Sequence, residues 1–144
     1  MIVTFCGHSE VQDRDSVQDW LKMTAEELVK QGADTFYLGG LHDYDALCAS
    51  TIRGLKKYYP SIKSVLVLPY PEIEVGAAEY DKVICAPQDD TPEQYRFTKR
   101  DFWMIEEADV IVTYITHTRS GAYMTYDYAK QKGKKILNYG GAEL

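Results

Sequence analysis

Cysteine, positive charge and long apolar runs are all scarce in this 144-residue chain. The three cysteines, Cys6, Cys48 and Cys85, are odd in number, widely spaced and form no C-x-x-C pair, so we expect neither a disulfide framework nor a zinc site. No stretch approaches the roughly 20 apolar residues of a membrane span, and the first residues lack the basic segment of a signal peptide. We therefore expect a cytoplasmic protein that has reduced thiols and does not contact a membrane.

Basic residues are outnumbered, with 16 Lys and Arg against 22 Asp and Glu, and the formal net charge is −6 at pH 7. Binding to a nucleic-acid backbone is driven by clustered basic side chains, so a nucleic-acid partner is disfavoured. The fingerprint G-x-G-x-x-G and the P-loop motif are also absent, which argues against an ordinary NAD dehydrogenase or NTPase. No cofactor or metal is expected. A small phosphate-bearing ligand remains open, because a few backbone amides can hold it.

The sequence does contain a regular alternation of two patterns. Short apolar runs predict strands at residues 2–6, 35–38, 64–68, 82–85, 110–115 and 135–139. Between them, apolar residues recur at helical spacing, for example at Val17, Leu21, Ala25 and Leu28. This order predicts an α/β fold, a Rossmann-like three-layer open parallel sheet with helices on both faces, in a single domain spanning residues 1–144.

Two other segments bear on the helix boundaries. Residues 91–94, Thr-Pro-Glu-Gln, combine an N-cap, a proline in the first turn and a capping-box glutamine, which predicts a helix from there to about Glu107. Residues 72–79 are ambiguous and are compatible with a short helix.

The segment from Asp109 to Gly133 is the centre of the prediction. Its strand ends in a polar loop at residues 116–120, and a helix follows from Gly121 or Ala122. A helix N-terminus above a sheet offers free N–H groups and the positive end of a dipole, which suits a phosphate. Glycines also end two other strands, at Gly7 and at residues 39–40. Ligands bind outside the carboxyl ends of strands in such sheets, so we expect these loops to converge on one pocket.

The expected ligand-binding residues lie in or near these loops, and two of them have open alternatives. The full set is Gly7, His8, Gly39, Gly40, Asp43, Asp45, Arg100, Ser120, Gly121, Ala122 and Tyr123. Arg100 could bind a phosphate through two N–H groups or form a surface salt bridge with Asp101 or Glu106. His8 could contact the ligand or order its own loop through a hydrogen bond to the backbone.

Three side chains in this set have more specific expected roles. Asp43 and Asp45 could accept a hydrogen bond from a ribose hydroxyl, although Asp43 is favoured as the N-cap of the second helix. Tyr123 could stack on a base, whereas Tyr126 is expected in the core or at an interface. Cys6 is expected to be a small buried side chain.

Several segments resemble, in the same order along the chain, motifs of one known group of proteins. They are Phe5-Cys6-Gly7-His8, Phe36-Tyr37-Leu38-Gly39-Gly40, residues 62–70, residues 99–105 and Ser120-Gly121-Ala122. They are similar to the motifs of the YpsA-like (DUF1273) family of the SLOG superfamily, which also contains LOG-like phosphoribohydrolases and the Rossmann domain of the DNA-processing protein DprA. The resemblance implies a pocket for nucleotides or nucleotide-derived molecules such as ADP-ribose or NAD derivatives.

Three functional classes follow from the resemblance and the residues. A sensor or sequestering module for a nucleotide-derived molecule is favoured, because no catalytic residues are evident as an acid–base pair or an activated nucleophile. The alternative is hydrolysis or transfer at an N-glycosidic bond, as in phosphoribohydrolases or nucleoside deoxyribosyltransferases, for which Asp45, Asp101 or Glu106 would supply a carboxylate. Thr125 stands at the position of the catalytic glutamate of LOG enzymes, which counts against their mechanism.

The third class, a DprA-like nucleic-acid partner, is disfavoured by the charge. A homodimer or higher homo-oligomer is expected from the general frequency of such assemblies.

Overall fold

Strands and helices alternate along the chain in the computed structural model, which describes residues 1–71 and 79–144. The strands are β1 (Ile2–Gly7), β2 (Thr35–Leu38), β3 (Lys63–Leu68), β4 (Lys82–Cys85), β5 (Val110–Tyr114) and β6 (Lys135–Asn138). The α-helices are α1 (Arg14–Lys30), α2 (Asp43–Lys56), α3 (Arg96–Glu107) and α4 (Gly121–Gln131), with short 3-10 turns η2 (Glu93–Tyr95) and η3 (Tyr139–Gly141). None of the helices in the described residues is long and apolar enough to cross a membrane.

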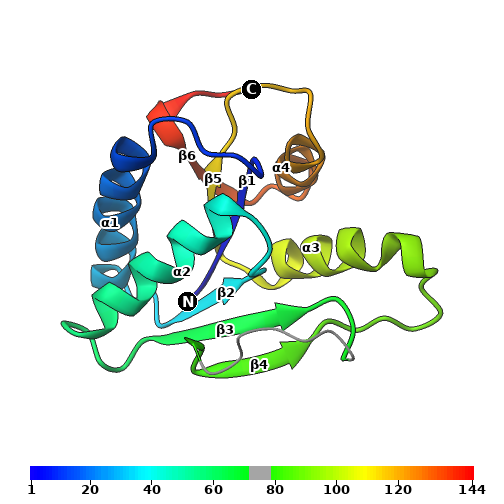
Figure 1. Ribbon diagram of the computed structural model, residues 1–144, viewed down its shortest axis with the longest axis horizontal. Coiled ribbons are helices and arrows are strands. Elements are labelled where there is room, and N and C mark those ends of the chain that lie inside the picture. Colours follow the sequence, from blue (N-terminus) through cyan, green and yellow to red (C-terminus); the bar gives the residue numbers. More distant parts are fainter. Residues whose placement is uncertain (72–78) are drawn as a thin grey trace.

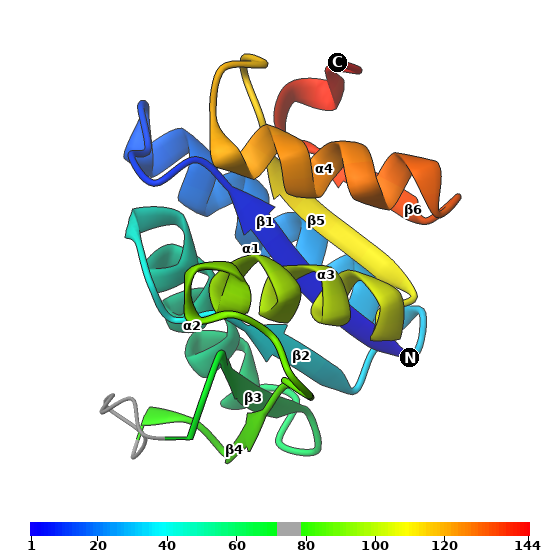
Figure 2. The same ribbon diagram turned by 90° about the vertical axis from the view of Figure 1, so that its right-hand side faces the viewer.

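The strands of the described residues form one sheet in the order β4-β3-β2-β1-β5-β6, and every neighbouring pair is parallel. Helices α1 and α2 cover one face of the sheet, and α3 and α4 cover the other (Figures 1 and 2). This arrangement confirms the predicted Rossmann-like three-layer sheet. The strand order reverses between β1 and β5, so the loops that follow these two strands separate and leave a crevice at their carboxyl ends.

The buried residues follow the two patterns seen in the sequence. Every residue of β5 is buried, as expected for a β-branched run at the centre of a parallel sheet covered on both faces. Helix α1 buries Val17, Leu21, Ala25 and Leu28, the face predicted from its spacing. The apolar periodicity therefore placed these elements correctly.

The beginning of α3 differs from the prediction. The α-helix begins at Arg96, and residues 93–95 form the 3-10 turn η2 instead. Pro92 has a ψ of 142°, an extended conformation that separates Thr91 from the helix. The residues at the N-cap positions of η2 and α3, Pro92 and Tyr95, make no side-chain capping hydrogen bond. The predicted capping box is therefore wrong, although the helix ends at Glu107 as expected. The short helix considered for residues 72–79 lies, apart from Glu79, outside the described residues.

Candidate functional site

A cavity of about 320 Å³ lies at the carboxyl end of β1. Its walls come from β1, the loop after β2, the first turn of α2, one face of α3 and the beginning of α4. Of the residues expected to bind a ligand, the cavity brings together Gly7, Gly39, Asp45, Arg100, Ser120, Gly121 and Ala122. His8, Gly40, Asp43 and Tyr123 do not line it. The three glycine-bearing loops thus meet around one space, at the edge where a doubly wound sheet binds ligands.

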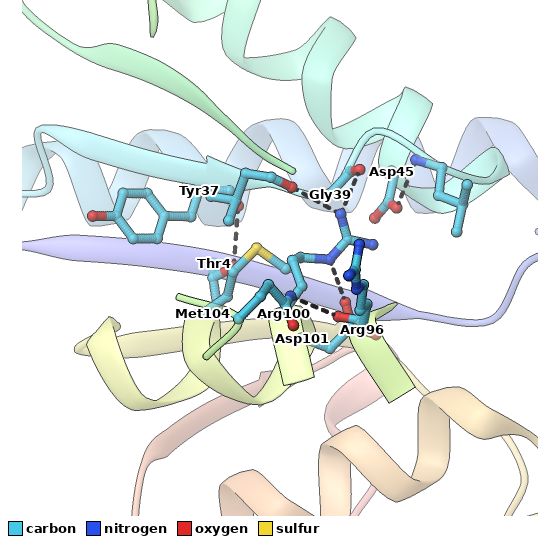
Figure 3. A network of polar contacts seen from close by, with 11 residues as sticks. Thr4, Tyr37, Gly39, Asp45, Arg96, Arg100, Asp101 and Met104 are labelled. Carbon is cyan, nitrogen blue, oxygen red and sulfur yellow. Dashed lines mark hydrogen bonds and ion pairs between the residues drawn. The ribbon is translucent and has the colours of Figure 1, made fainter. Parts of the chain in front are cut away.

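Arg100 is buried in the wall that α3 contributes, with only 3% of its surface exposed. Its Nη1 donates to the carbonyl oxygens of Gly39 at 3.1 Å and Val67 at 2.8 Å, and its Nε donates to Asp101 at 2.8 Å. Figure 3 shows the guanidinium reaching from α3 to the end of β2, with Asp45 nearby. The salt bridge to Asp101 exists, but it is not the surface pair that was considered. Nη2 makes no hydrogen bond within the described residues.

Asp45 and Asp101 place two carboxyl groups in the same cavity. Burial raises the pKa of Asp45 above its usual value, and this effect exceeds the opposing effect of the Leu41 N–H, which donates to Asp45 Oδ2 at 3.1 Å. Burial likewise raises the pKa of Asp101, against the opposing charge of Arg100. Paired carboxyl groups with raised pKa values are a common feature of sites that bind or transfer protons.

The burial of Asp45 predicts a change of stability with pH. Since its pKa is higher in the folded chain than in the unfolded one, the stability that it gives at low pH is lost as the pH rises through the folded pKa. The variant Asp45→Asn keeps an acceptor for the Leu41 N–H and carries no charge. We expect urea unfolding to show this variant more stable than the wild type at pH 7, with a smaller difference at pH 4.

Asp81 provides the matched control. Burial would raise its pKa, but hydrogen bonds from Lys56 and Ser64 outweigh burial and lower the pKa below its usual value. Asp81→Asn should therefore destabilise the chain at pH 7. If both variants change the free energy of unfolding in the same direction, burial does not control Asp45.

The beginning of α4 forms the wall opposite α2. Ser120 is its N-cap, and the Oγ of Ser120 accepts a hydrogen bond from the N–H of Tyr123 at 3.4 Å. The N–H groups of Gly121 and Ala122 have no carbonyl of the preceding turn to bond, and no described residue accepts from them. The cavity wall therefore carries unpaired N–H donors at the positive end of a helix dipole.

His8 lies behind this wall and 6% of its surface is exposed. Its Nε2 accepts a hydrogen bond from the N–H of Thr116 at 2.9 Å, and its Nδ1 is 2.8 Å from Ser120 Oγ. Burial, and secondarily the charge of His117, lowers the pKa of His8. His8 thus makes the loop-ordering hydrogen bond to the backbone that was considered, and a contact of His8 with a ligand stays a prediction.

Gly40 and Tyr123 have roles in the fold. Gly40 has a φ of +68°, and a Cβ there would lie 2.7 Å from Leu66 Cδ1, so glycine is needed for the turn and its packing. Tyr123 packs against Tyr126, which is buried as expected. Neither residue lines the cavity.

Asp43 is not the predicted N-cap of α2. It is the first residue of the helix, and His42 occupies the cap position without a side-chain capping hydrogen bond. The Asp43 carboxylate is exposed, 3.8 Å from Arg14. The carboxylate of Asp45 instead accepts a hydrogen bond from the N–H of Leu41, in the loop before α2. This contact depends on how the chain turns after Gly40.

The cavity also contains Cys6 and Thr125, which the sequence did not assign to a ligand, and Asp101, which it named only as a possible carboxylate of the alternative enzymatic function. Cys6 is buried as expected, its Sγ donates to the carbonyl of Ala122 at 3.3 Å, and burial raises its pKa, so it is a poor nucleophile. Thr125, at the position of the LOG glutamate, is buried in the wall.

The fold and the cavity together define a Rossmann-like α/β domain with a polar site at its topological switch point. No protein-family model matches the sequence, and no curated protein matches it. Solved structures of DNA processing protein A do match. The Helicobacter pylori protein has 17% identity and a TM-score of 0.67, over 96% of this chain and 64% of that one. The Streptococcus pneumoniae protein, DprA, has 15% identity and a TM-score of 0.68, over 99% of this chain and 51% of that one.

These likenesses, at 17% and 15% identity, show the fold alone. Membership of the SLOG superfamily, which the sequence motifs indicated, stays a prediction. This chain spans less than two thirds of either matched chain. The narrower YpsA-like family has no matching family model and stays a prediction.

One expectation about partners was wrong. The H. pylori protein is described by its single-stranded DNA binding mode. A protein of this fold can therefore have a nucleic-acid partner, and the net charge of this chain is not a sufficient reason to disfavour one. Net charge averages over the whole surface, whereas binding depends on the groups at one site. The expected oligomer stays a prediction.

Proposed function

We propose that this chain binds a nucleotide-derived molecule in the cavity and acts as a sensor or sequestering module. A phosphate group lies against the beginning of α4, where Ser120, Gly121 and Ala122 supply donors. Ribose hydroxyl groups lie against Asp45 and Asp101 on the opposite side. The cavity volume of about 320 Å³ is within the range of small-molecule sites.

One observation carries this proposal: unpaired donors and two carboxyl groups line the same cavity. N–H groups at a helix N-terminus bind the oxygens of a phosphate. Carboxylates accept hydrogen bonds from vicinal hydroxyls, as in other dinucleotide-binding folds. A phosphorylated ribose offers both kinds of group at a spacing of a few bonds, so it satisfies both walls together.

The direct test is a calorimetric and thermal-shift titration of the purified protein with ADP-ribose, NAD and AMP, with mass spectrometry of each mixture afterwards. A ligand at about 100 times its Kd should stabilise the chain by about 2.7 kcal/mol. Recovery of the intact ligand is expected for a sensor or sequestering module. If none of the three binds, the proposed function is wrong for this class of ligand.

Gly121→Ala tests where the ligand lies. A Cβ at Gly121 meets no atom within 4 Å, so the variant should fold with unchanged or slightly greater stability, up to about 1 kcal/mol. The methyl group would stand at the cavity wall and keep a phosphate from the backbone N–H groups. We expect the affinity for ADP-ribose to fall about tenfold, which corresponds to about 1.4 kcal/mol. Calorimetry measures the affinity, and urea unfolding measures the stability.

Gly54→Ala is the matched control, since its Cβ also meets no atom within 4 Å and Gly54 lies in α2 away from the cavity. It should gain similar stability and keep full affinity. Equal affinities for the two variants would place the ligand elsewhere.

A second candidate function is hydrolysis or transfer at an N-glycosidic bond, and the two carboxyl groups with raised pKa favour it. One protonated and one ionised carboxyl group can share the roles of acid and base or nucleophile. Release of a free base from a nucleotide, abolished by Asp45→Asn or Asp101→Asn, would select this function. The stability gain expected for Asp45→Asn makes a loss of folding an inadequate explanation for such a loss of turnover.

A single-stranded oligodeoxynucleotide is a further ligand for the same titration. A phosphodiester in a DNA strand presents the same oxygens to α4 as the phosphate of a free nucleotide does. The titration must therefore compare free nucleotides with an oligonucleotide. If the oligonucleotide binds with a steep salt dependence and the free nucleotides do not bind, the partner is a strand.

A further inference from the structure

Four groups in and behind the wall that α4 gives the cavity form a directed series of hydrogen bonds. The N–H of Thr116 donates to His8 Nε2 at 2.9 Å. His8 Nδ1 is 2.8 Å from Ser120 Oγ, to which the N–H of Tyr123 also donates, at 3.4 Å. The series joins the loop after β1, the loop after β5 and the first turn of α4.

The direction of this series follows from the first bond. A backbone N–H can only donate, so Nε2 must be the acceptor and carries no proton. A neutral imidazole then carries its proton on Nδ1, which donates to Ser120 Oγ. With the His8 proton and the Tyr123 N–H, Ser120 Oγ accepts two hydrogen bonds, which occupy both of its lone pairs. Its own proton points away from both donors, and Ser120 lines the cavity.

We propose that His8 is a positioning residue that fixes the Ser120 hydroxyl as a hydrogen-bond donor toward the ligand. The site thereby selects a hydrogen-bond acceptor, such as an anionic oxygen, at that position and disfavours a hydroxyl or amine donor. This inference rests on the proposed function for its ligand, but the state of His8 can be measured without one.

Protonation of His8 breaks this series of hydrogen bonds, because an Nε2–H group cannot accept a hydrogen bond from the N–H of Thr116. The titratable groups that contact the imidazole are His117, whose ring stacks on it at 4.0 Å, and Tyr114, whose ring meets it edge-on at 5.7 Å. Neither is a carboxylate, and burial, followed by the charge of His117, lowers the pKa of His8. The site is therefore intact at neutral pH and is lost as the pH falls through the lowered pKa.

Side-chain nitrogen NMR of the wild-type protein at pH 7 tests the tautomer directly. We expect His8 to show a protonated Nδ1 and an unprotonated Nε2. A His8 protonated at Nε2, or charged at pH 7, overturns the proposal whether or not any ligand binds.

Two variants test the roles of the two imidazole nitrogens separately. Asn at position 8 places an amide donor near Nδ1, and Gln places a carbonyl acceptor near Nε2. We expect His8→Asn to bind ADP-ribose nearly as well as the wild type, and His8→Gln to bind it about tenfold more weakly, in keeping with the loss of one hydrogen bond. Backbone NMR spectra establish that both variants are folded. Equal affinities for the two variants would contradict a directed role.

The pH profile distinguishes this role from a purely structural one. ADP-ribose keeps a constant charge in its diphosphate between pH 5 and 8, so changes in affinity report on the protein. Wild-type affinity should fall by up to about tenfold as the pH falls through the pKa of His8 and then level off, matching the loss expected for His8→Gln. His8→Asn should lack this part of the fall, while Asp45 and Asp101 affect both proteins alike. If affinity depends on pH in the same way for both proteins, the proposal is wrong. If neither protein binds ADP-ribose at pH 7.5, only the proposed ligand class is refuted.

Discussion

Arg100→Met is expected to lower the free energy of unfolding by about 3 kcal/mol. The guanidinium is almost completely buried and donates to the carbonyl oxygens of Gly39 and Val67. Methionine fills a similar volume but donates nothing, so two carbonyl groups lose their partner and Asp101 loses its neighbouring charge. Urea unfolding at pH 7 measures the effect. The loss should exceed that of any variant at an exposed arginine.

Arg14→Met is the matched control for that loss. The side chain of Arg14 is 54% exposed and its nearest charged atom, on Asp43, is 3.8 Å away. Exposed pairs of this kind contribute little, so the control should change stability by less than about 0.5 kcal/mol. Arg100→Lys should fall between the two variants, because an ammonium group keeps the charge but lacks the fork that joins three acceptors. If Arg100→Met behaves like Arg14→Met, the buried network does not stabilise the fold.

Apolar periodicity and glycine placement made the fold predictable from the sequence. The strand at β5 is apolar throughout because both of its faces are covered, and α1 shows one buried stripe because only one of its faces is. These patterns arise from burial, which leaves its mark on composition at each position. The predicted start of α3 was wrong because a capping box describes only local hydrogen bonding. The conformation of Pro92 separated that signal from the helix.

The cavity was only partly predictable for a similar reason. Glycines at the ends of β1 and β2 and at the start of α4 marked the loops, since parallel strands end at the same edge of the sheet. The direction of each side chain depended on packing that has no sequence signature. Asp43 and Asp45 are two residues apart, yet α2 turns one to solvent and the other into the cavity. Arg100 lines the site because α3 buries its side chain there, and its charge alone did not predict this position.

Gly7→Ala should give the second large loss, about 3 kcal/mol or more, through overpacking. A Cβ at Gly7 would lie 2.4 Å from Cδ2 and 2.6 Å from Cγ of Tyr44. Tyr44 has 1% of its surface exposed and its hydroxyl donates to the carbonyl of Val112 at 3.0 Å, so the ring cannot move without losing that bond. Urea unfolding measures the loss, with Gly54→Ala as a control that should not destabilise the chain.

A double-mutant cycle with Tyr44→Leu identifies the cause of that loss. The smaller side chain removes the ring atoms that a Cβ at Gly7 would meet, although it also leaves the Val112 carbonyl unpaired and a void in the core. In the Tyr44→Leu background, Gly7→Ala should therefore destabilise the chain by about 1 kcal/mol or less, and the coupling energy should be about 2 kcal/mol. Additive effects would instead assign the loss to the Gly7 backbone. Glycine would then be needed at the end of β1 for its conformation and not for the close approach of α2.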